Sequence, residues 1–460
     1  MIYPVEKRAY ELFYKGALAL AKAERVGFRI DVKYCEDKKK ELTEEIERLE
    51  KELLKTRFVR HWQHYFSHKF NINSNFQLSH ILYKVRKIKP VKLTKSGMGA
   101  TDDEALKGIA GQVPELEKIL RMRRLKKIRD TYLDAFLREQ VGGVIHPFFN
   151  LTTARSYRSS CEAPNFQNIP KRDKEAQEIT RKAIYPRKGH QLLEVDYKSL
   201  EVVIAACYHK DPNMIEYLTN PKSDMHADIA KQIFFLDELD KHVPEQKKLR
   251  TAAKNGFVFP QFYGATYESC AYNLAYGWGE VPYGKWKGGI RINGVCLVDW
   301  LREKGVKSFR GFEKHIEDIK QDFWYNRFPR YRRWRERMWK LYQKRGWLKM
   351  KTGFCCSGVL KRNEVINRPI QGSAFHCLLW SFIRLTEISE EENWDSKLIG
   401  QIHDSILIDL NPDERDVVVQ TVKRVMCEDI RKEWDWLIIP LDVEFAISPV
   451  DGSWYEQEDL

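Results

Sequence analysis

Apolar residues recur at helical spacing through the first third of the chain. Between residues 36 and 58 they follow alternating four- and three-residue steps, with Glu and Lys filling most other positions, which predicts a long helix with one apolar seam. The seam consists of Leu42, Ile46, Leu49 and Leu53. Residues 70–74 predict a turn that ends in a helix-capping serine, after which residues 77–85 and 114–139 are predicted to be helical.

Beyond the glycine pair at 142–143 the pattern changes to short strands and turns. An apolar strand over residues 192–195 precedes a helical pattern that begins near residue 199. Helical patterns dominate residues 209–350, and residues 398–410 predict a strand, a tight turn and a second strand. The chain is therefore predicted to be an α+β protein in which a helical arm precedes half of a sheet, a helical insertion and the other half of the sheet.

Composition indicates what kind of partner the protein binds and where in the cell it is expected. The 460 residues include 79 Lys and Arg against 65 Asp and Glu, and this net charge of +14 favours a polyanionic partner. No uninterrupted apolar run approaches the roughly 18 residues of a membrane span, and the N-terminus lacks the pattern of a secretion signal. The nine cysteines include no C-x-x-C pair, which indicates reduced thiols rather than disulfides or a zinc site. We therefore expect a cytoplasmic protein without a membrane partner.

Two carboxylates follow apolar strands that are far apart in the sequence. Asp196 ends the strand over residues 192–195, and Asp404 lies in the turn within residues 398–410. Acids at strand ends can meet at one edge of a sheet, and such a pair suits Mg²⁺, which takes few carboxylates and completes its shell with phosphates and water. Two ions about 3.5–4 Å apart can activate an attacking oxygen and stabilise a leaving one. The alternative, for either residue alone, is an ordinary turn cap.

Arg250 and Lys254 form a second candidate group, because residues at i and i+4 share one face of a helix. Cations in this arrangement can bind the oxygens of a triphosphate and stabilise the charge that develops on the leaving pyrophosphate. Phe257, Phe259 and Tyr263 follow closely and supply aromatic rings that can lie against a base and a sugar. The alternative is an amphipathic helix whose cations are simply solvated.

Five segments, in order along the chain, resemble motifs of family A DNA polymerases. Residues 196–201, D-Y-K-S-L-E, resemble motif A, which is usually D-Y-S-Q-I-E. Residues 250–264 are similar to motif B, R-x-x-x-K followed by Phe and Y-G, and residues 403–405, H-D-S, are similar to motif C, H-D-E. Residues 164–170, P-N-F-Q-N-I-P, and 367–372, N-R-P-I-Q-G, are similar to the family's P-N-L-Q-N-I-P and N-x-P-I-Q-G.

This resemblance implies a right-hand polymerase fold with an antiparallel-sheet palm, helical fingers and a helical thumb. It implies a thumb in residues 1–143, a palm in residues 144–208 and 351–460, and fingers in residues 209–350. The implied activity is template-directed DNA synthesis, in which deoxynucleotides are added to a primer 3′ end by two-metal-ion nucleotidyl transfer. The implied partners are primer–template DNA, deoxynucleoside triphosphates and two Mg²⁺ ions, and we expect a monomer.

The resemblance also implies roles at the reacting centre. Asp196 and Asp404 would hold both metal ions, with the Tyr197 carbonyl as a further ligand. Glu201 would block the ribose 2′-hydroxyl and so exclude ribonucleotides. Catalytic assistance would come from Lys254, which is placed to bind the triphosphate and to protonate pyrophosphate.

The remaining implied roles concern the nucleotide and the DNA. Arg250 and His226 would contact the triphosphate, and Tyr263 would stack near the templating base. Asn367 and Gln371 would read the minor-groove side of the new base pair. The other positions expected at the primer and template are Arg158, His403, Asn165 and Gln167, together with Arg123 and Lys127 from the basic strip over residues 121–129.

Several departures from the motifs leave alternatives open. Ser405 stands where motif C has Glu, so we do not expect that position to bind metal directly. The spacing from Lys254 to Tyr263 is one residue longer than usual, so that either Phe259, which we prefer, or Phe257 faces the nucleotide. The basic residue near the primer is Arg158 or Arg155. The sequence does not decide between Arg158 and Arg155.

The resemblance implies a role for a second basic segment and an expectation about the start of the chain. Residues 327–351 hold many cations and the single acid Glu336. The cations are expected to face single-stranded template. Tyr331, Trp334, Met338 and Leu341 share helical spacing there and are predicted to be core. Because only about 15 residues precede the thumb-like segment over residues 17–31, we expect no nuclease domain in this chain. A separate exonuclease or another replisome protein could then supply proofreading, and the sequence does not distinguish a naturally short form from a truncated one.

Two other functions remain as alternatives. A single-subunit RNA polymerase shares the metal-binding acids and the Lys…Tyr-Gly helix, although Glu201 argues against it. A non-catalytic nucleic-acid-binding relative is the second alternative, and the presence of both acids and Lys254 argues against that.

Overall fold

The computed structural model describes residues 3–4, 6–170, 173–240, 242–275 and 290–460. The chain divides into two compact units, one formed by Met1–Ile30 with Glu139–Leu460 and the other by Asp31–Arg138. Among the described residues, no helix is both long enough and apolar enough to cross a membrane. All nine cysteines have free thiols.

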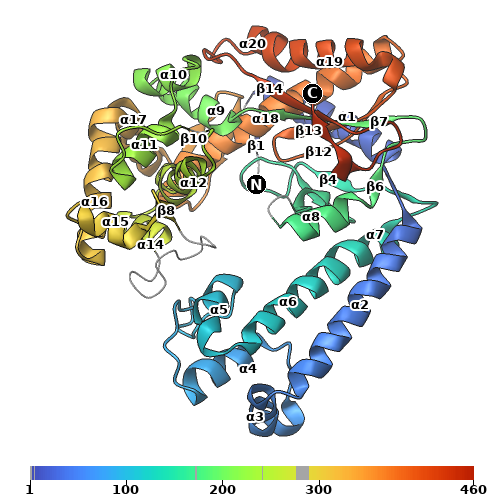
Figure 1. Cartoon of the computed structure of the whole chain (residues 1–460). Helices are drawn as coiled ribbons and strands as arrows, with labels where there is room; N and C mark the ends of the chain where they lie inside the picture. Colours follow the sequence, from blue (N-terminus) through green and yellow to red (C-terminus); the bar gives the residue numbers. More distant parts are fainter. Residues whose placement is uncertain (1–2, 5, 171–172, 241, 276–289) are drawn as a thin grey trace. The chain divides into compact units, whose positions relative to one another are not determined.

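In the unit of residues 31–138, α2 (Val32–Leu54) and α6 (Glu115–Lys127) pack side by side (Figure 1). The predicted seam of α2 is confirmed, because its four apolar residues are all buried. The helix predicted over residues 36–58 ends earlier than expected. Thr56 accepts a hydrogen bond from the Val59 N–H and begins a separate helix, because a capping side chain satisfies an amide that would otherwise have no partner.

The other helices of this unit follow the predicted order. Ser74 caps a helix as expected, accepting a hydrogen bond from the Gln77 N–H. The helix predicted over residues 114–139 is continuous through a π-helical turn at Ile128–Leu133. The remaining helices are α3 (Arg57–Phe66), α4 (Asn75–Ser79), α5 (Asp103–Ile109) and α7 (Asp134–Glu139).

The other unit is built around a five-stranded antiparallel sheet in the order β12-β13-β7-β14-β15. The strands are β7 (Gln191–Tyr197), β12 (Lys397–Ile402), β13 (Ser405–Leu410), β14 (Val443–Ile447) and β15 (Glu458–Asp459). The predicted strand, tight turn and strand over residues 398–410 are thus confirmed. Pairing of β13 with β7 joins the two halves of the sheet, which are separated by about two hundred residues of sequence.

Helices cover one face of this sheet, and Tyr197 of β7 points toward them. The Tyr197 hydroxyl donates to the Met426 carbonyl (3.0 Å) and lies 2.9 Å from the Ser381 hydroxyl in α18 (Arg362–Glu391). Because side chains alternate along a strand, Glu194 and Asp196 point to the opposite face. The helices beside α18 in this part of the chain are α9 (Leu200–His209), α19 (Arg415–Arg424) and α20 (Ile430–Glu433).

The first helix, α1 (Lys7–Val26), belongs to the sheet-bearing unit and not to the helical arm expected over residues 1–143. It packs against α18 and β12. Gly16 permits the close approach, since a Cβ there would lie 2.8 Å from a methyl group of Leu379. The arm is therefore shorter than predicted, because the buried face of α1 is complementary to α18.

Helices also make up most of the chain between β7 and β12 (Figure 1). A fully buried carboxylate joins two of them: Asp211 caps α10 and accepts hydrogen bonds from the backbone N–H groups of Arg330 and Tyr331 at the start of α17. As predicted, Tyr331 and Trp334 are buried. The helices are α10 (Pro212–Thr219), α11 (Met225–Phe234), α12 (Pro244–Ala253), α13 (Phe259–Phe262), α14 (Tyr267–Leu274), α15 (Leu297–Glu303), α16 (Phe309–Gln321) and α17 (Pro329–Arg345).

Short strands and one further helix complete this unit. Two small sheets have three strands, in the orders β3-β2-β6 and β1-β11-β10, and two hairpins have two strands. The strands are β1 (Tyr3–Pro4), β2 (Phe28–Ile30), β3 (Val144–Ile145), β4 (Phe148–Asn150), β5 (Ser160–Glu162), β6 (Ile184–Tyr185), β8 (Arg291–Ile292), β9 (Val295–Cys296), β10 (Trp347–Lys349) and β11 (Phe354–Ser357). The helix α8 (Lys174–Arg181) lies between β5 and β6 in the sequence.

Candidate active site

The two carboxylates singled out from the sequence lie on neighbouring strands. Asp196 is paired with Ser405, the first residue of β13, and Asp404 forms the turn just before it. The Tyr197 N–H donates to the Asp404 carbonyl at 3.2 Å, which fixes this turn against β7. His403, the other turn residue, has a φ of 55°, a backbone conformation that L-residues rarely adopt and that recurs at functional sites.

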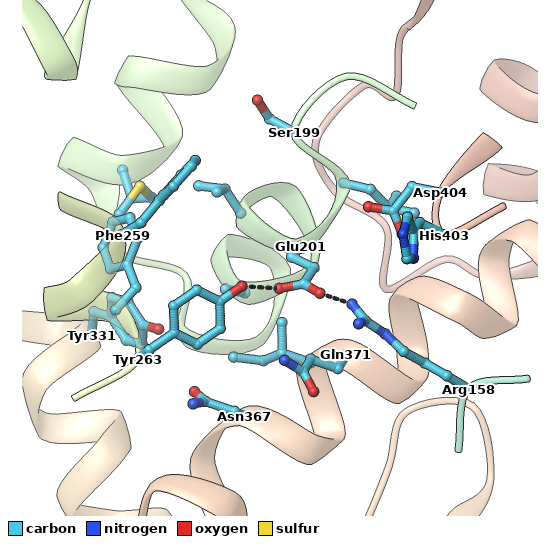
Figure 2. Close-up of a pocket in the computed structure, with 16 residues that line it drawn as sticks. Arg158, Ser199, Glu201, Phe259, Tyr263, Tyr331, Asn367, Gln371, His403 and Asp404 are labelled. Atoms are coloured by element: carbon cyan, nitrogen blue, oxygen red, sulfur yellow. Dashed lines mark hydrogen bonds and ion pairs between the residues drawn. The ribbon is translucent and has the colours of Figure 1, made fainter. Parts of the chain in front are cut away.

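A pocket of about 460 Å³ opens beside this turn and collects most of the residues predicted from the motifs (Figure 2). His403 and Asp404 lie at one side of it, and Phe259 and Tyr331 at the other. The predicted site residues that line it are Arg158, Glu201, Phe259, Tyr263, Asn367, Gln371, His403 and Asp404. Asp196 lines a second pocket, of about 510 Å³, on the face of the sheet that carries Glu194.

A chain of polar contacts runs through the first pocket. The Tyr263 hydroxyl donates to one carboxylate oxygen of Glu201 at 2.7 Å, and Arg158 donates to the other (Figure 2). Burial raises the pKa of Tyr263, so its hydroxyl stays protonated and remains a donor. The structure thus brings Arg158, and not the exposed Arg155, into the pocket.

The predicted phosphate-binding residues converge from two helices and the turn that follows. Arg250 in α12 donates to Asp224 at 2.7 Å and lies 3.4 Å from Nδ1 of His226 in α11. The Lys254 ammonium lies 5.1 Å from the centre of the Phe259 ring. Burial, with Arg250 and Lys254 nearby, lowers the pKa of His226 to about 4, so this imidazole is neutral at pH 7. Among the described residues, its buried Nε2 has no hydrogen-bond partner.

A π-helical turn at Lys254–Val258 accounts for the long spacing in this segment. Such a turn accommodates one additional residue in a helix, and π-turns are frequent at functional sites. Within the turn, Phe257 points into the core, where it is 0% exposed and contacts Phe323. Phe259 instead lines the pocket. The structure therefore brings Phe259 to the site, as we preferred.

Asn367 and Gln371 lie one helical turn apart near the start of α18, and both line the pocket. Gln167 is outside this lining: it donates to the Ser159 hydroxyl at 2.8 Å. Asn165 precedes a short helical turn at Phe166–Asn168. The structure therefore does not bring these last two residues into the pocket; they follow Arg158 in the same segment of the chain.

The basic strip over residues 121–129 lies in the other unit. Arg123 is half-buried and donates to the Thr101 carbonyl, and burial lowers its pKa. Arg121 forms an ion pair with Glu45 in α2, whereas Lys127 is exposed. Part of the strip thus holds α6 against α2, so exposed Lys127 is better placed than Arg123 to meet an external phosphate.

The sequence analysis did not assign two residues that shape the site. Tyr331 was predicted to be core, and it is buried, but it also lines the pocket. Asp224 caps α11 and orients Arg250. The Asp-x-His pattern at residues 224–226 was the available signal for Asp224. No sequence signal distinguishes a core tyrosine from one at a pocket wall.

The chemistry of the acidic residues fits magnesium. Within the described part of the chain, no group of three or more His, Cys, Asp or Glu residues is arranged to hold a metal ion. Mg²⁺ does not require such a group, because proteins commonly bind it through one or two carboxylates and leave the other positions to water and substrate phosphates. Asp196 and Asp404, on adjacent strands, supply ligands of this kind.

Comparison with known proteins identifies the family. The family model described as DNA polymerase family A matches residues 32–281 and 302–456. The chain belongs to DNA polymerase family A. Its curated relatives include DNA polymerase I of *Caldicellulosiruptor bescii*, which is 28% identical over 95% of this chain and 46% of the relative. DNA polymerase I of *Geobacillus stearothermophilus* is 27% identical over 95% of this chain and 44% of the relative.

The fold of this family A chain is also that of a solved polymerase. The POL domain of Pol1 from *M. smegmatis*, solved in complex with DNA primer–template and dNTP, has a TM-score of 0.73 and 22% identity, covering 96% of this chain and 70% of that one. The expected right-hand polymerase fold is therefore confirmed. The chain spans about half the length of the curated relatives it matches.

Proposed function

We propose that this chain is a DNA-directed DNA polymerase that extends a primer on a template by two-metal-ion nucleotidyl transfer. The observation that carries the proposal is the pocket itself. Segments that are far apart in the sequence bring Glu201, Tyr263, Gln371 and Asp404 to its walls. An ordinary turn cap at Asp404 would not require these side chains to converge.

In this proposal, Asp196 and Asp404 hold two Mg²⁺ ions with the backbone carbonyl of Tyr197. When bound, the ions lower the pKa of the primer 3′-hydroxyl and stabilise the leaving pyrophosphate. The strands position the two carboxylates, because Asp196 faces Ser405 in the register next to Asp404. His403 lies beside them and contacts the primer end.

The incoming nucleotide is bound by the cations of α12 and the following turn. Arg250 and His226 contact the triphosphate oxygens, and Lys254 protonates the leaving pyrophosphate. One observation supports the role of Lys254. Burial, with Arg250 nearby, lowers the pKa of Lys254, and a lowered pKa makes an ammonium a better proton donor.

The base and sugar are selected on the other walls of the pocket. Phe259 and Tyr263 lie against the base pair, and Glu201 excludes a ribose 2′-hydroxyl. The contacts from Arg158 and Tyr263 support this role for Glu201, because they hold its carboxylate in one position. The minor-groove side of the new pair and the adjoining primer and template contact Arg158, Asn165, Gln167, Asn367 and Gln371.

The rest of the chain serves the DNA substrate. The unit of residues 31–138 is the thumb, with Lys127 and Arg123 on the side of the product duplex. The five-stranded sheet with the rest of residues 144–208 and 351–460 is the palm, and residues 209–350, which contain α10 to α17, form the fingers. The net charge of +14 supports contacts with phosphates, which would be independent of DNA sequence.

Primer extension by the purified protein, with and without Mg²⁺, tests the proposal. Asp404→Ala should abolish extension while duplex binding changes little, because the carboxylate acts on the reaction and not on the DNA backbone. Asp413→Ala is a matched control, since Asp413 is exposed in the short 3₁₀ turn Pro412–Glu414 that follows β13. Extension by Asp404→Ala at the control rate would refute the metal-binding role.

Ribonucleotides test the alternative of an RNA polymerase. With all four ribonucleotides and no deoxynucleotides, a DNA polymerase that carries Glu201 should extend the primer inefficiently. Efficient synthesis from ribonucleotides alone would favour the RNA polymerase instead.

A further inference from the structure

A buried carboxylate lies on the palm sheet beside the two proposed metal ligands. Glu194 precedes Asp196 by two residues in β7, so both side chains point to the same face of the sheet. The two residues line the same pocket, yet Glu194 is only 7% exposed. A carboxylate removed from water in this way is costly unless its oxygens have partners.

Each oxygen of Glu194 has a partner. One accepts a hydrogen bond from the Ser405 hydroxyl at 3.0 Å, and the other accepts one from the Trp454 indole N–H at 2.9 Å. The guanidinium of Arg181 lies 3.7 Å from the second oxygen and 4.0 Å from the centre of the Trp454 ring. Arg181 is also buried, so this pair compensates the charge of the carboxylate inside the protein.

Ser405 connects this carboxylate to the catalytic turn. It is 0% exposed, follows Asp404 directly and pairs with Asp196 across the strands. Its hydroxyl has a single proton and also lies 2.9 Å from the Ile402 carbonyl at the base of the turn, so Glu194 and this carbonyl share the donor. The motif that residues 403–405 resemble has Glu where this chain has Ser405. Glu194, on the neighbouring strand β7, thus places a carboxylate beside Ser405, where the motif has one of its own.

We propose that Glu194 is a positioning residue for Asp196 and Asp404, and that it replaces from β7 the motif C carboxylate that Ser405 lacks. This inference rests on the proposed polymerase function. Through Ser405, Glu194 ties the strand that carries Asp196 to the turn that carries Asp404. Loss of this tie should weaken magnesium use, because the two proposed ligands would no longer be held at a fixed separation.

The test compares two variants that each remove one donor to Glu194. Ser405→Ala removes the donor at the catalytic turn, and Trp454→Phe removes the other donor while keeping a ring beneath Arg181. Each variant removes one hydrogen-bond donor to the buried carboxylate, so both should lower thermal stability. The measurements are the thermal unfolding midpoint and the Mg²⁺ concentration that gives half-maximal primer extension.

We expect Ser405→Ala to raise the half-maximal Mg²⁺ concentration by about tenfold, the effect of losing one hydrogen bond to a charged group. Trp454→Phe should keep the Mg²⁺ dependence of the unmodified protein. Equal Mg²⁺ dependence in the two variants would reduce Glu194 to a structural residue and overturn the inference. If the unmodified protein extends no primer, the proposed function itself fails, which is a different result.

An exchange of the two side chains provides a second test. Ser405→Glu alone places two carboxylates against each other in a buried site and should reduce extension strongly, because like charges in contact are destabilising there. Adding Glu194→Ser removes that repulsion and returns one carboxylate to the site. The double variant should recover most of the activity that the single variant loses. A double variant no more active than Ser405→Glu would show that the two carboxylates do not substitute for each other.

Discussion

Replacement of two neighbouring phenylalanines should have opposite consequences, although both belong to the same short segment. Phe257 is fully buried and packs edge-on against Phe323, with 5.6 Å between ring centres. Phe259 lines the active-site pocket, where its ring lies near the Lys254 ammonium and the His226 ring. The π-helical turn at Lys254–Val258 causes this difference in direction.

The expected magnitudes follow from these environments. Phe257→Ala leaves a cavity in the core and should cost about 3–5 kcal/mol of stability. Phe259→Ala removes a ring from a pocket wall, so the loss of stability should be much smaller. If the ring stacks on the incoming base, its removal costs about 1–3 kcal/mol of nucleotide binding. Because 1.4 kcal/mol is a factor of ten, the KM for nucleotide should rise roughly 5- to 150-fold.

Thermal unfolding and steady-state primer extension measure the two effects separately. Phe257→Ala should lower the unfolding midpoint and, at a temperature where it remains folded, keep a KM close to that of the unmodified protein. Phe259→Ala should raise the KM and keep the midpoint. The reverse result, a raised KM in Phe257→Ala with Phe259→Ala unaffected, would refute the assignment of the nucleotide-facing ring.

Three further changes test other contacts. Glu201→Ala should improve ribonucleotide use relative to deoxynucleotide use by roughly 10- to 200-fold in kcat/KM; unchanged sugar selection would place the gate elsewhere. Gly256→Ala should lower the unfolding midpoint, at a cost of about 1–3 kcal/mol, because the new Cβ would lie 2.6 Å from Leu274. An unchanged midpoint would contradict this close packing. Acid should destabilise the fold, because burial lowers the pKa of His209 and of His376 to about 3 each, from an ordinary 6.5. The unfolded chain then binds protons that the folded chain does not, so stability is complete above pH 6.5 and falls below it, by about 2 kcal/mol per residue at pH 5. In unfolding scans, His209→Gln should lose less stability between pH 7 and pH 5 than the unmodified protein, and an equal loss would assign the acid sensitivity to other groups.

Local pattern was enough to predict much of the fold. The buried seam of α2, the cap at Ser74 and the two strands around Asp404 all depend on residues close together in sequence. The position of α1, in contrast, does not depend on residues close together in sequence. Its buried face is equally compatible with an arm or with the sheet-bearing unit, and packing against Leu379, more than 350 residues away, decides between them. Sequence periodicity shows that a face is buried but not which partner covers it.

The same limit applies to the site. The motifs indicated the residue types, but two choices needed three-dimensional information. A π-helical turn decides between Phe257 and Phe259, and the long spacing from Lys254 to Tyr263 indicated an additional residue but not where it is accommodated. The choice between Arg158 and Arg155 depends on which side chain reaches Glu201, a residue more than forty positions further along the chain.

Two carboxylates of the sheet-bearing unit, Glu201 and Glu194, share a feature that bears on their proposed roles. Both oxygens of Glu201 are engaged, by Tyr263 and Arg158, and both oxygens of Glu194 are engaged as well. A carboxylate with an arginine beside it gains less from binding a cation, because the metal must first displace or repel the guanidinium. Glu201 and Glu194 are therefore poor metal ligands despite their positions. In the proposed function their fixed geometry suits them instead to act on a neighbour: Glu201 on the sugar of the incoming nucleotide, and Glu194 on the turn that carries Asp404.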